Sequence, residues 1–564
     1  MVHLESDVLV IGAGGAGMYA AIAAAREGCT VNLIDRSLIG RGGATVMAQM
    51  TVAAAIGEQV PDDWTHHYKD TLTAGRGLCN EPLARLLCED GPTRIREMEA
   101  WKVGWARENG HIKQVAAPGH DRARCVYVDF LNTGPAVSKT LRTRLQNLNQ
   151  VRRIGDLTVV DLVVKDSEVL GAVALHLNTG QVVTLAAKSV IVATGGLTRL
   201  YWRNSASFNM GGDGFALALR AGAELIDMEF VQFFPIGHLA PRMIGMDPIM
   251  WDPFRYKLGG RLLNADKEEF GERYGQTEDG NYVLTRDVAT YAIFKENEAG
   301  RGSPHGGAYL SFEHIPEAEL RRNFGPVIDR LAANGIDLTK MPIEVAPIAH
   351  YHMGGIRVDA DLQTKIGGLL AAGEAVGGAN GANRLSGNAI TEALVFGHRA
   401  GTVAAARARK TGGNNWDDKA AQPIVDFIAS AAPRGDRPNP ARLVPELQTL
   451  MQEKVGPFRT GAKLEAAIDY LLTLRDQLGD VPFAGKPGFD TEMLDWLDLR
   501  NMQLVGETIA RAALARVESR GAHQREDHPG LKPNWELNQA VRLRDGHMIY
   551  ERLPVVRAAA AKVA

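Results

Sequence analysis

The hydrophobic residues at the start of the chain form two short unbroken runs with a longer apolar stretch between them. The runs Asp7 to Ile11 and Thr30 to Ile34 have the length and continuous apolar character of buried strands. The stretch from Met18 to Arg26 is rich in alanine, which favours helix more than any other residue. The pattern therefore predicts a strand–helix–strand unit at the start of the chain.

Apolar runs also predict strands far along the chain. Ser189 to Ala193 leads into Thr194-Gly195-Gly196, and Leu369 to Ala372 leads into Gly373-Glu374. Asn388-Ala389-Ile390 then opens a predicted helix from Thr391 to Ala405. Further on, apolar residues recur at helical spacing and predict two more helices, one through Leu464, Ile468, Leu471 and Leu472, the other through Leu504, Ile509, Ala513 and Leu514.

Length and charge narrow the class of protein. A chain of 564 residues is too long for one compact core, so we expect roughly two to four domains. The net charge of −3 argues against a nucleic-acid-binding protein. No basic segment with a following apolar run precedes Asp7, so we expect no signal peptide. Because no apolar run reaches ~18 residues either, we expect a cytoplasmic protein without direct membrane insertion. Any membrane association would come through a partner.

The cysteines exclude one kind of cofactor. Cys29, Cys79, Cys88 and Cys125 form no CxxC pair and no regular metal-binding spacing. The chain should therefore hold no iron–sulfur cluster and no metal of its own.

Glycines in the first predicted turn indicate dinucleotide binding. Gly12, Gly14 and Gly17 form G-x-G-x-x-G between the first strand and the helix, and Asp35 ends the second strand. The first glycine permits a tight turn, the second lets the backbone approach a pyrophosphate, and the third allows close helix–strand packing. The helix start would offer N–H groups to the phosphates, and Asp35 would bind a ribose diol. The alternative is a glycine turn without a ligand.

Two later segments favour FAD over NAD. Thr194-Gly195-Gly196 is typical of the point where a flavoprotein chain returns to the adenosine. Glu374 could accept a hydrogen bond from a ribose or ribityl hydroxyl. The amides at the start of the helix at Asn388 could face the flavin N1–C2=O edge and stabilise negative charge there.

Ordered motifs over most of the chain resemble the flavoprotein subunits of the succinate dehydrogenase and fumarate reductase family, which includes L-aspartate oxidase. Besides the G-x-G-x-x-G segment, the motifs are Thr45-Val46-Met47-Ala48-Gln49, Met210-Gly211-Gly212-Asp213-Gly214, Glu229 to Phe233, Thr285-Arg286-Asp287, His350-Tyr351, Gly381 to Leu385 and Ser519 to Asp527.

The resemblance implies an α/β fold in four parts. A split Rossmann-type FAD-binding domain would comprise residues 1–231 and 346–406, with an α+β capping domain inserted at 232–345. A C-terminal helical domain would cover 407–535, and a C-terminal tail 536–564. The cofactor-binding residues implied are Gly12, Gly14, Gly15, Ala16, Gly17, Asp35, Arg36, Gly42, Gly43, Ala44, Thr45, Thr194, Gly195, Asp213, Gly373, Glu374, Asn388, Ala389 and Ile390.

The implied reaction removes or adds hydrogens at adjacent carbons of a carboxylic acid, with hydride transfer at flavin N5. The resemblance implies that Arg384 grips a carboxylate through its planar guanidinium and that His350 hydrogen-bonds the acid. Arg286 matches the family's proton-transfer residue, which acts with a neighbouring acid, here Asp287. The alternatives are a structural ion pair for Arg286 and a core histidine for His350. His352 stands where the family usually has Asn, and we interpret it as structural.

Departures from the family pattern concern the flavin and the far end of the substrate. Ala44 occupies the position of the family's covalent flavin histidine, so we expect non-covalent FAD, as in a soluble member of the family. Phe234 and Ile236 replace a substrate-binding histidine and a threonine. With Trp251, Asp252 and Arg255 they are the predicted substrate pocket, for an acid whose far end is not a simple carboxylate. An arginine at 242 or 255 could instead form an anion site, or the pocket could still fit succinate or fumarate.

Three functions remain open at this stage. The first is a catalytic subunit that exchanges electrons with a separate iron–sulfur subunit. The second is a stand-alone flavin oxidase of the L-aspartate oxidase type. The third is a non-catalytic electron-transfer flavoprotein, which the presence of Arg286, His350 and Arg384 disfavours.

Overall fold

The computed structural model describes residues 1–129, 131–243, 249–251, 255, 258–274, 286–325, 327–484 and 491–558, without the side chains of residues 286 and 287. The chain divides into two compact units. The first comprises Met1–Trp202, Ala206–Gln232 and Tyr351–Ala564, and the second Arg203–Ser205 and Phe233–His350. The second unit therefore interrupts the first, at a place close to the predicted insertion at 232–345.

A seven-stranded sheet forms the centre of the first unit. Four parallel pairings join β7 (Val151–Ile154), β2 (Val31–Ile34), β1 (Val2–Ile11), β10 (Gln181–Val192) and β17 (Leu369–Ala371). The antiparallel strands β9 (Glu168–His176) and β8 (Leu157–Lys165) continue the sheet beyond β10. The predicted strands at Asp7, Thr30, Ser189 and Leu369 are confirmed as β1, β2, β10 and β17, and β1 and β10 begin earlier than the apolar runs alone indicated.

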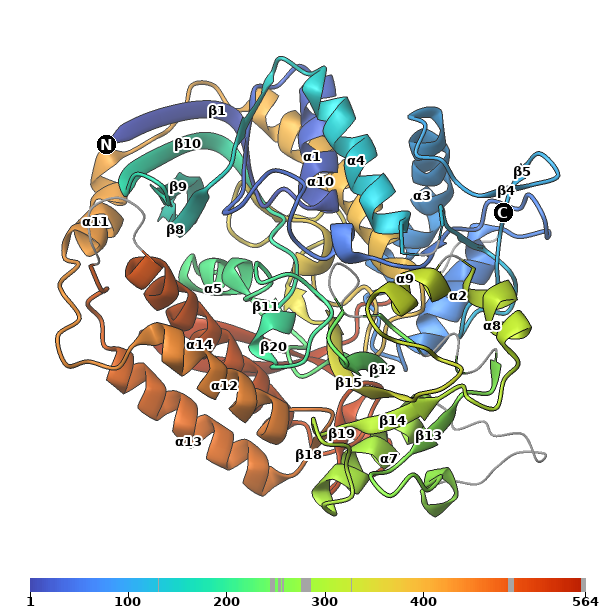
Figure 1. Cartoon of the computed structure of the whole chain (residues 1–564). Helices are drawn as coiled ribbons and strands as arrows, with labels where there is room; N and C mark the ends of the chain where they lie inside the picture. Colours follow the sequence, from blue (N-terminus) through green and yellow to red (C-terminus); the bar gives the residue numbers. More distant parts are fainter. Residues whose placement is uncertain are drawn as a thin grey trace. The chain divides into compact units, whose positions relative to one another are not determined.

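The helices that follow β1 and precede the C-terminal domain lie side by side (Figure 1). They are α1 (Gly15–Arg26) and α10 (Asn388–Lys410), each longer than the helix predicted from its apolar residues. A Cβ at Gly397 would lie 2.5 Å from the Ala16 carbonyl oxygen, and one at Gly401 2.3 Å from that of Ala20. Glycines four residues apart thus let α10 approach the backbone of α1 closely.

The rest of the first unit consists of helices and short strands. The helices are α2 (Trp64–Ala74), α3 (Glu81–Ala100), α4 (Thr133–Gln146), α5 (Asp213–Arg220), α11 (Asp418–Ala429), α12 (Pro440–Lys454), α13 (Gly461–Leu478) and α14 (Thr491–Ala515). Single 3-10 turns are η1 (Thr45–Met47), η2 (Thr198–Leu200), η4 (Gly373–Ala375) and η5 (Pro533–Trp535). Two-stranded sheets pair β3 (Val52–Ala53) with β6 (Cys125–Val126), β4 (Arg107–Glu108) with β5 (His111–Ile112), and β18 (Phe458–Arg459) with β19 (Gln524–Arg525).

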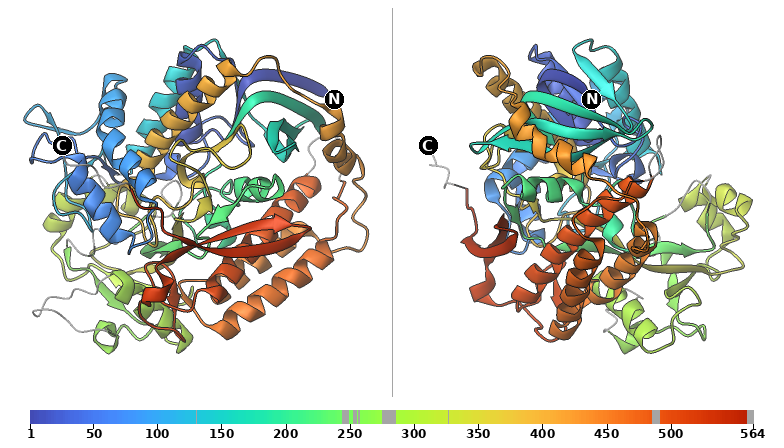
Figure 2. Two further views of the ribbon diagram at one scale, coloured as in Figure 1. Left: turned by 180° about the vertical axis from the view of Figure 1, so that it is seen from behind. Right: turned by 90° about the vertical axis from the view of Figure 1, so that its left-hand side faces the viewer.

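The end of the chain contributes a hairpin to a second sheet. Strands β20 (Leu537–Arg544) and β21 (His547–Pro554) are antiparallel, and β20 also pairs with β11 (Leu225–Ile226), which pairs with β16 (Gly355–Ile356). In Figure 2 the hairpin is the long red ribbon beside the orange helices α13 and α14. Helices α13 and α14 confirm the helical periodicity at Leu464 and Leu504.

The second unit is a four-stranded sheet with helices. Its strands are β12 (Val231–Ala240), β15 (Ile343–His352), β14 (Ala308–Ser311) and β13 (Arg261–Leu263). Its helices are α7 (Arg286–Glu298), α8 (Glu317–Phe324) and α9 (Val327–Ala333), with a 3-10 turn η3 (Gly271–Arg273). An inserted α+β unit in a split α/β fold, with helices near the C-terminus, confirms the predicted fold class.

Candidate functional site

The turn between β1 and α1 has two glycines that the fold requires and one that it does not. Gly12 has φ +99°, and a Cβ there would lie 2.4 Å from the Ala193 carbonyl oxygen. A Cβ at Gly17 would lie 1.8 Å from the carbonyl oxygen of Gly12. At Gly14, by contrast, no atom of the described chain lies within 4 Å of the added Cβ. The space beside Gly14 is therefore open to a ligand, as the pyrophosphate role requires.

Helix α1 presents its N-terminus at this space. Its N-cap is Gly14, which has no side chain to cap the first amides, and its first turn carries no acidic residue. Gly15 N donates a 3.2 Å hydrogen bond to Thr45 Oγ1, which brings the 42–48 segment against the helix start. Uncapped amides and the positive end of the helix dipole together favour a phosphate.

Asp35 is fixed beside the glycine turn. Its Oδ2 accepts a 2.7 Å hydrogen bond from Ala13 N, and its Oδ1 accepts from the amide and the hydroxyl of Ser37, both at 2.8 Å. A carboxylate offers about four acceptor positions, so one remains for a ribose hydroxyl.

The ends of β10 and β17 hold two polar groups that suit a flavin nucleotide. Thr194 Oγ1 is buried and has no hydrogen-bond partner among the described residues. Glu374 follows β17 in η4, where its Oε1 accepts a 3.1 Å hydrogen bond from His352 N. Burial, with the nearby Glu392 carboxylate, raises the pKa of Glu374 to about 8. A buried hydroxyl without a partner normally indicates a missing ligand or water.

Helix α10 starts at Asn388, the residue at which the sequence predicted a helix start facing the flavin. Its N-cap is Gly387, with φ +83°, and in the described chain no side chain caps its first amides. The buried Asn388 side chain instead joins neighbouring elements, since its Oδ1 bonds His67 Nε2 at 2.8 Å and its Nδ2 donates to Thr71 Oγ1 at 3.2 Å. The helix start is thus held by α2, and Asn388 N donates to the Leu385 carbonyl. The amides of the next residues have no side-chain cap in the described chain.

Two predicted cofactor residues take part in an ion-pair cluster. Arg36 donates from Nη1 to Asp213 Oδ2 and from Nη2 to Asp498 Oδ2, both at 2.9 Å. Arg199 also pairs with Asp498. These contacts tie the loop after β2 to α5 and α14. Contact of Arg36 or Asp213 with the cofactor stays a prediction.

Arg384 is held from two sides within the first unit. Its Nη2 donates a 3.0 Å hydrogen bond to Gln232 Oε1, and its Cζ lies 4.4 Å from the centroid of the Tyr351 ring. Gln232 also donates from Nε2 to Asn383 Oδ1 at 2.9 Å and to the Arg384 carbonyl at 3.1 Å. A guanidinium fixed in this way can present a planar fork to a carboxylate.

Sequence reasoning did not find the polar cluster next to Arg384. Tyr351 OH donates a 2.7 Å hydrogen bond to Glu392 Oε2, and Asn380 Nδ2 donates to the same oxygen at 2.6 Å. Asn388 Nδ2 contacts Asn380 Oδ1 at 3.4 Å and so extends the cluster to the start of α10. Tyr351 was noticed only as part of a motif, and a glutamate within an apolar helix was the signal that could have drawn attention to Glu392.

His350 is positioned by residues of the second unit. Ser205 Oγ and His350 Nδ1 are 2.7 Å apart, so the hydroxyl can fix the imidazole tautomer and orientation. The Phe234 ring lies edge-on to the imidazole, with centroids 5.6 Å apart. The substituted position 234 therefore contacts the residue predicted to bind the substrate.

Most of the other predicted pocket residues are deep in the second unit. Ile236 and Trp251 are both 0% exposed and Arg255 is 2% exposed. The Trp251 ring packs on Phe312 and Phe324, at centroid distances of 6.1 and 5.9 Å. Its contacts are explained by the core of the unit, and a place in the pocket wall stays a prediction. Asp252 lies outside the described residues.

Arg286 is the first residue of α7, but its side chain and that of Asp287 are outside the described part of the chain.

The predicted structural role of His352 fits its surroundings. It is 0% exposed, its Nε2 is 3.1 Å from the Met228 carbonyl oxygen, and burial lowers its pKa to about 4.

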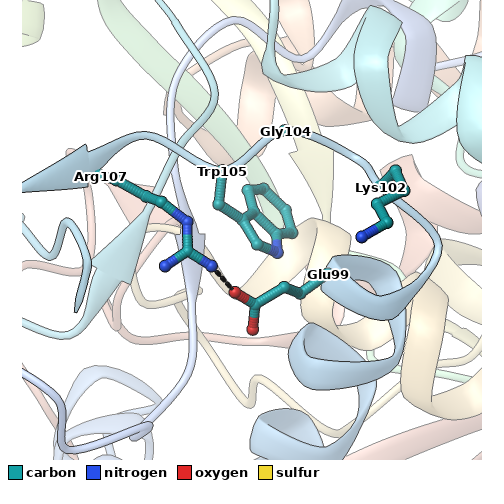
Figure 3. Close-up of a pocket in the computed structure, with 5 residues that line it drawn as sticks. All are labelled: Glu99, Lys102, Gly104, Trp105 and Arg107. Atoms are coloured by element: carbon teal, nitrogen blue, oxygen red, sulfur yellow. Dashed lines mark hydrogen bonds and ion pairs between the residues drawn. The ribbon is translucent and has the colours of Figure 1, made fainter. Parts of the chain in front are cut away.

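A separate cavity of about 250 Å³ lies at the end of α3, lined by Glu99, Lys102, Gly104, Trp105 and Arg107 (Figure 3). Arg107 forms an ion pair with Glu99 there. None of these residues belongs to the predicted flavin or substrate site, so we assign the cavity no part in the reaction.

The described residues contain neither a metal-binding group nor a membrane-spanning helix. No group of three or more His, Cys, Asp or Glu side chains is arranged to hold a metal ion. Within the same residues, no helix is both long enough and apolar enough to cross a lipid bilayer.

Comparison with known proteins agrees with this geometry. A profile for an FAD-binding domain matches residues 7–390, and one for the C-terminal region of fumarate reductase flavoproteins matches residues 445–554. A fumarate reductase (CoM/CoB) subunit of Methanothermobacter marburgensis is 36% identical over 539 residues, covering 94% of this chain and 96% of that protein. The fumarate reductase flavoprotein subunit of Escherichia coli is 33% identical over 549 residues, covering 93% and 89%.

A solved structure shows the same fold. Mycobacterium smegmatis Sdh1 in complex with UQ1 superposes with a TM-score of 0.90 at 35% identity, covering 99% of this chain and 95% of that one. The chain belongs to the succinate dehydrogenase and fumarate reductase flavoprotein family. It is an FAD-dependent oxidoreductase acting on CH–CH groups.

Proposed function

We propose that the protein interconverts a saturated carboxylic acid and its α,β-unsaturated form, and that the acid carries one carboxylate and a less polar far end. FAD, when bound, supplies hydride transfer at N5. The observation that carries the proposal is Arg384, a guanidinium only 9% exposed that Gln232 and Tyr351 hold in place.

Arg384 binds the substrate carboxylate and neutralises the charge that develops on it when the adjacent carbon loses a proton. His350, oriented by Ser205, donates to the same acid. Arg286 transfers the proton at the neighbouring carbon. Because a lone guanidinium hardly ever loses its proton, Arg286 needs a partner acid such as Asp287.

The contact between Phe234 and His350 supports a substrate whose far end is not a carboxylate. A phenyl ring, whose centroid here lies 5.6 Å from that of the imidazole, can neither donate a hydrogen bond to a second carboxylate nor neutralise it, as a histidine there could. Ile236, next but one on β12, adds no polar group. The pocket around His350 therefore favours an apolar or aromatic substituent on the acid.

We infer that electrons pass to or from a separate iron–sulfur protein. The proposal is supported by relatives that match nearly the whole chain and are named as subunits of fumarate reductases. We also propose that FAD is held without a covalent bond, since Ala44 offers no side chain that could form one.

Substrate profiling tests the proposal. Purified protein is assayed under anaerobic conditions with fumarate, succinate and β-substituted acrylates and propionates. We expect kcat/KM for acids with an apolar β-substituent to exceed that for fumarate by about tenfold or more, the effect of one well-placed apolar group. Phe234→His should move the preference toward fumarate. Micromolar KM and the highest kcat/KM for succinate or fumarate in the unaltered protein would contradict the altered pocket.

A further inference from the structure

Three buried side chains from different segments form a stack behind the predicted carboxylate site. Arg384 of the loop before α10 lies over the ring of Tyr351, at 4.4 Å from its centroid. Tyr351, near the end of β15, donates its hydroxyl to Glu392 Oε2 at 2.7 Å. Tyr351 is 3% exposed and Glu392 0% exposed. The tyrosine thus links a charged guanidinium on one side to a carboxyl group on the other.

We propose that Glu392 is a positioning residue that controls how Arg384 binds the substrate carboxylate, acting through Tyr351. The inference rests on the proposed carboxylate-binding function of Arg384.

In the described chain, hydrogen bonds reach only one of the two carboxyl oxygens of Glu392. Oε2 accepts hydrogen bonds from Tyr351 and Asn380, whereas Oε1 is buried and has no hydrogen-bond partner in the described chain. No described donor holds Oε1 in the ionised form. Glu392 can therefore carry a proton on Oε1 or lose it.

Several elements contribute ionisable groups near the Glu392 carboxyl or near the helix that carries it. Burial raises the pKa of Glu392 to about 7, while Tyr351, Asn380 and Arg384 oppose the rise. Glu374 of η4 is a second buried carboxyl on which the Glu392 charge acts. A path of three hydrogen bonds, through Asn380 and Asn388, joins Glu392 to His67 of α2. Tyr19 of α1 and Arg94 of α3 lie near His398 of the same helix rather than near Glu392.

The charge on Glu392 changes what Arg384 offers to a ligand. When Glu392 is ionised, its negative charge and the more electron-rich ring of the hydrogen-bonded tyrosine both attract the guanidinium. A substrate carboxylate must then compete with that attraction and with repulsion from Glu392. When Glu392 is neutral, the charge of Arg384 is available to the substrate. Carboxylate binding should therefore weaken as pH rises through about 7.

The test measures binding to the FAD-loaded protein without turnover. Phenylacetate and malonate are suitable probes, because neither has the adjacent CH–CH pair that the enzyme needs. Their Kd values are measured by calorimetry from pH 5.5 to 9, in the unaltered protein and in Glu392→Gln. We expect the unaltered protein to bind roughly five- to tenfold more weakly at the high end. Glu392→Gln, which is always neutral, should keep the tight binding throughout.

Tyr351→Phe provides a second, independent variant. It keeps the ring beneath Arg384 but removes the hydroxyl that contacts Glu392, so it should lose most of the pH step, and adding Glu392→Gln to it should change little. Glu507→Gln is the matched control, since it removes a buried carboxylate that pairs with Arg511 on α14, and it should retain the full pH step.

The outcomes separate this inference from the function on which it rests. An unchanged pH step in Glu392→Gln, or additive effects of the two variants, would overturn the role of Glu392 alone. Failure of the unaltered protein to bind either acid at any pH would overturn the carboxylate-binding function of Arg384 and this inference with it.

Discussion

Arg384 donates a 3.0 Å hydrogen bond from Nη2 to Gln232 Oε1, and Gln232 in turn holds the loop that carries the arginine through the Asn383 side chain and the Arg384 carbonyl. The glutamine therefore fixes both the guanidinium and its backbone before any ligand binds. Preorganisation of this kind lowers the cost of binding a carboxylate.

Replacing Gln232 should weaken substrate binding more than it slows the chemical step. We expect Gln232→Leu to raise KM by about tenfold, the effect of one hydrogen bond to a charged group, with a smaller change in kcat. Gln503→Leu, a buried glutamine of α14 outside the site, is the control. Equal KM values for Gln232→Leu and the unaltered protein would show that Gln232 does not orient Arg384.

A positive charge at position 384 should not by itself sustain full activity. Arg384→Lys keeps the positive charge but loses the planar fork and the stacking on Tyr351. We expect kcat/KM to fall by about 100-fold or more while the FAD content, read from the flavin absorbance, stays unchanged. Activity within a few-fold of the unaltered enzyme would rule out a bidentate carboxylate contact.

The glycines of the β1–α1 turn provide a matched pair for the cofactor site. Gly17→Ala would place a Cβ 1.8 Å from the Gly12 carbonyl oxygen, so we expect it to unfold the domain or abolish its expression. Gly14→Ala meets no described atom within 4 Å, and it should fold with an unchanged melting temperature of the FAD-free protein.

Because the Cβ would enter the space assigned to the pyrophosphate, Gly14→Ala should also weaken FAD binding by about tenfold or more. Measuring Kd for FAD by flavin fluorescence during reconstitution checks this. Normal FAD affinity in Gly14→Ala would place the pyrophosphate elsewhere.

Asp227 should make the fold less stable as pH rises toward neutrality. Burial, together with the Glu229 charge, raises the pKa of its carboxyl from near 4 to about 7. A group whose pKa is higher in the folded state adds stability that is fully present below its unfolded pKa and is lost as pH rises through the folded pKa. The melting temperature should therefore fall between pH 4.5 and 8.

Asp227→Asn is the variant that isolates this effect. Position 227 has φ +57°, which asparagine tolerates, and an amide does not titrate. The variant should show a flatter dependence of melting temperature on pH, and an identical fall in both proteins would assign the effect to another group.

FAD should leave the protein on denaturation. With alanine at position 44, acid precipitation is expected to release the flavin into the supernatant and leave a colourless pellet. A yellow pellet that resists washing would demonstrate a covalent link through another residue.

Sequence patterns predicted those elements of the fold that depend on neighbouring residues. The apolar run at Asp7, the glycines after it and the acid at 35 lie within one strand–helix–strand unit, and the structure reproduces that unit. The helix after Asn388 was predicted as well, although it extends to Lys410. Backbone geometry within some thirty residues is largely set by neighbouring residues, and so periodicity and turn chemistry are sufficient there.

Contacts between distant segments could not be read from the sequence. Arg36 pairs with Asp498, which is 462 positions away, and Glu392 meets Tyr351 across 41 positions. Trp251 was predicted to line a pocket, and the sequence did not indicate that its ring also packs on Phe312 and Phe324. Single-sequence patterns identify a buried residue but not the partners that surround it.

The central claim is that the protein transfers hydrogen to and from a carboxylic acid at a CH–CH bond, and single-turnover kinetics tests it most directly. Chemically reduced, FAD-loaded protein is mixed under anaerobic conditions with fumarate and β-substituted acrylates, and flavin absorbance is followed. We predict rapid reoxidation by at least one unsaturated acid, with formation of the saturated product, and none in Arg286→Ala, which should retain its FAD. A flavin that stays reduced with every acid, or one that is reoxidised equally fast in Arg286→Ala, would contradict the account.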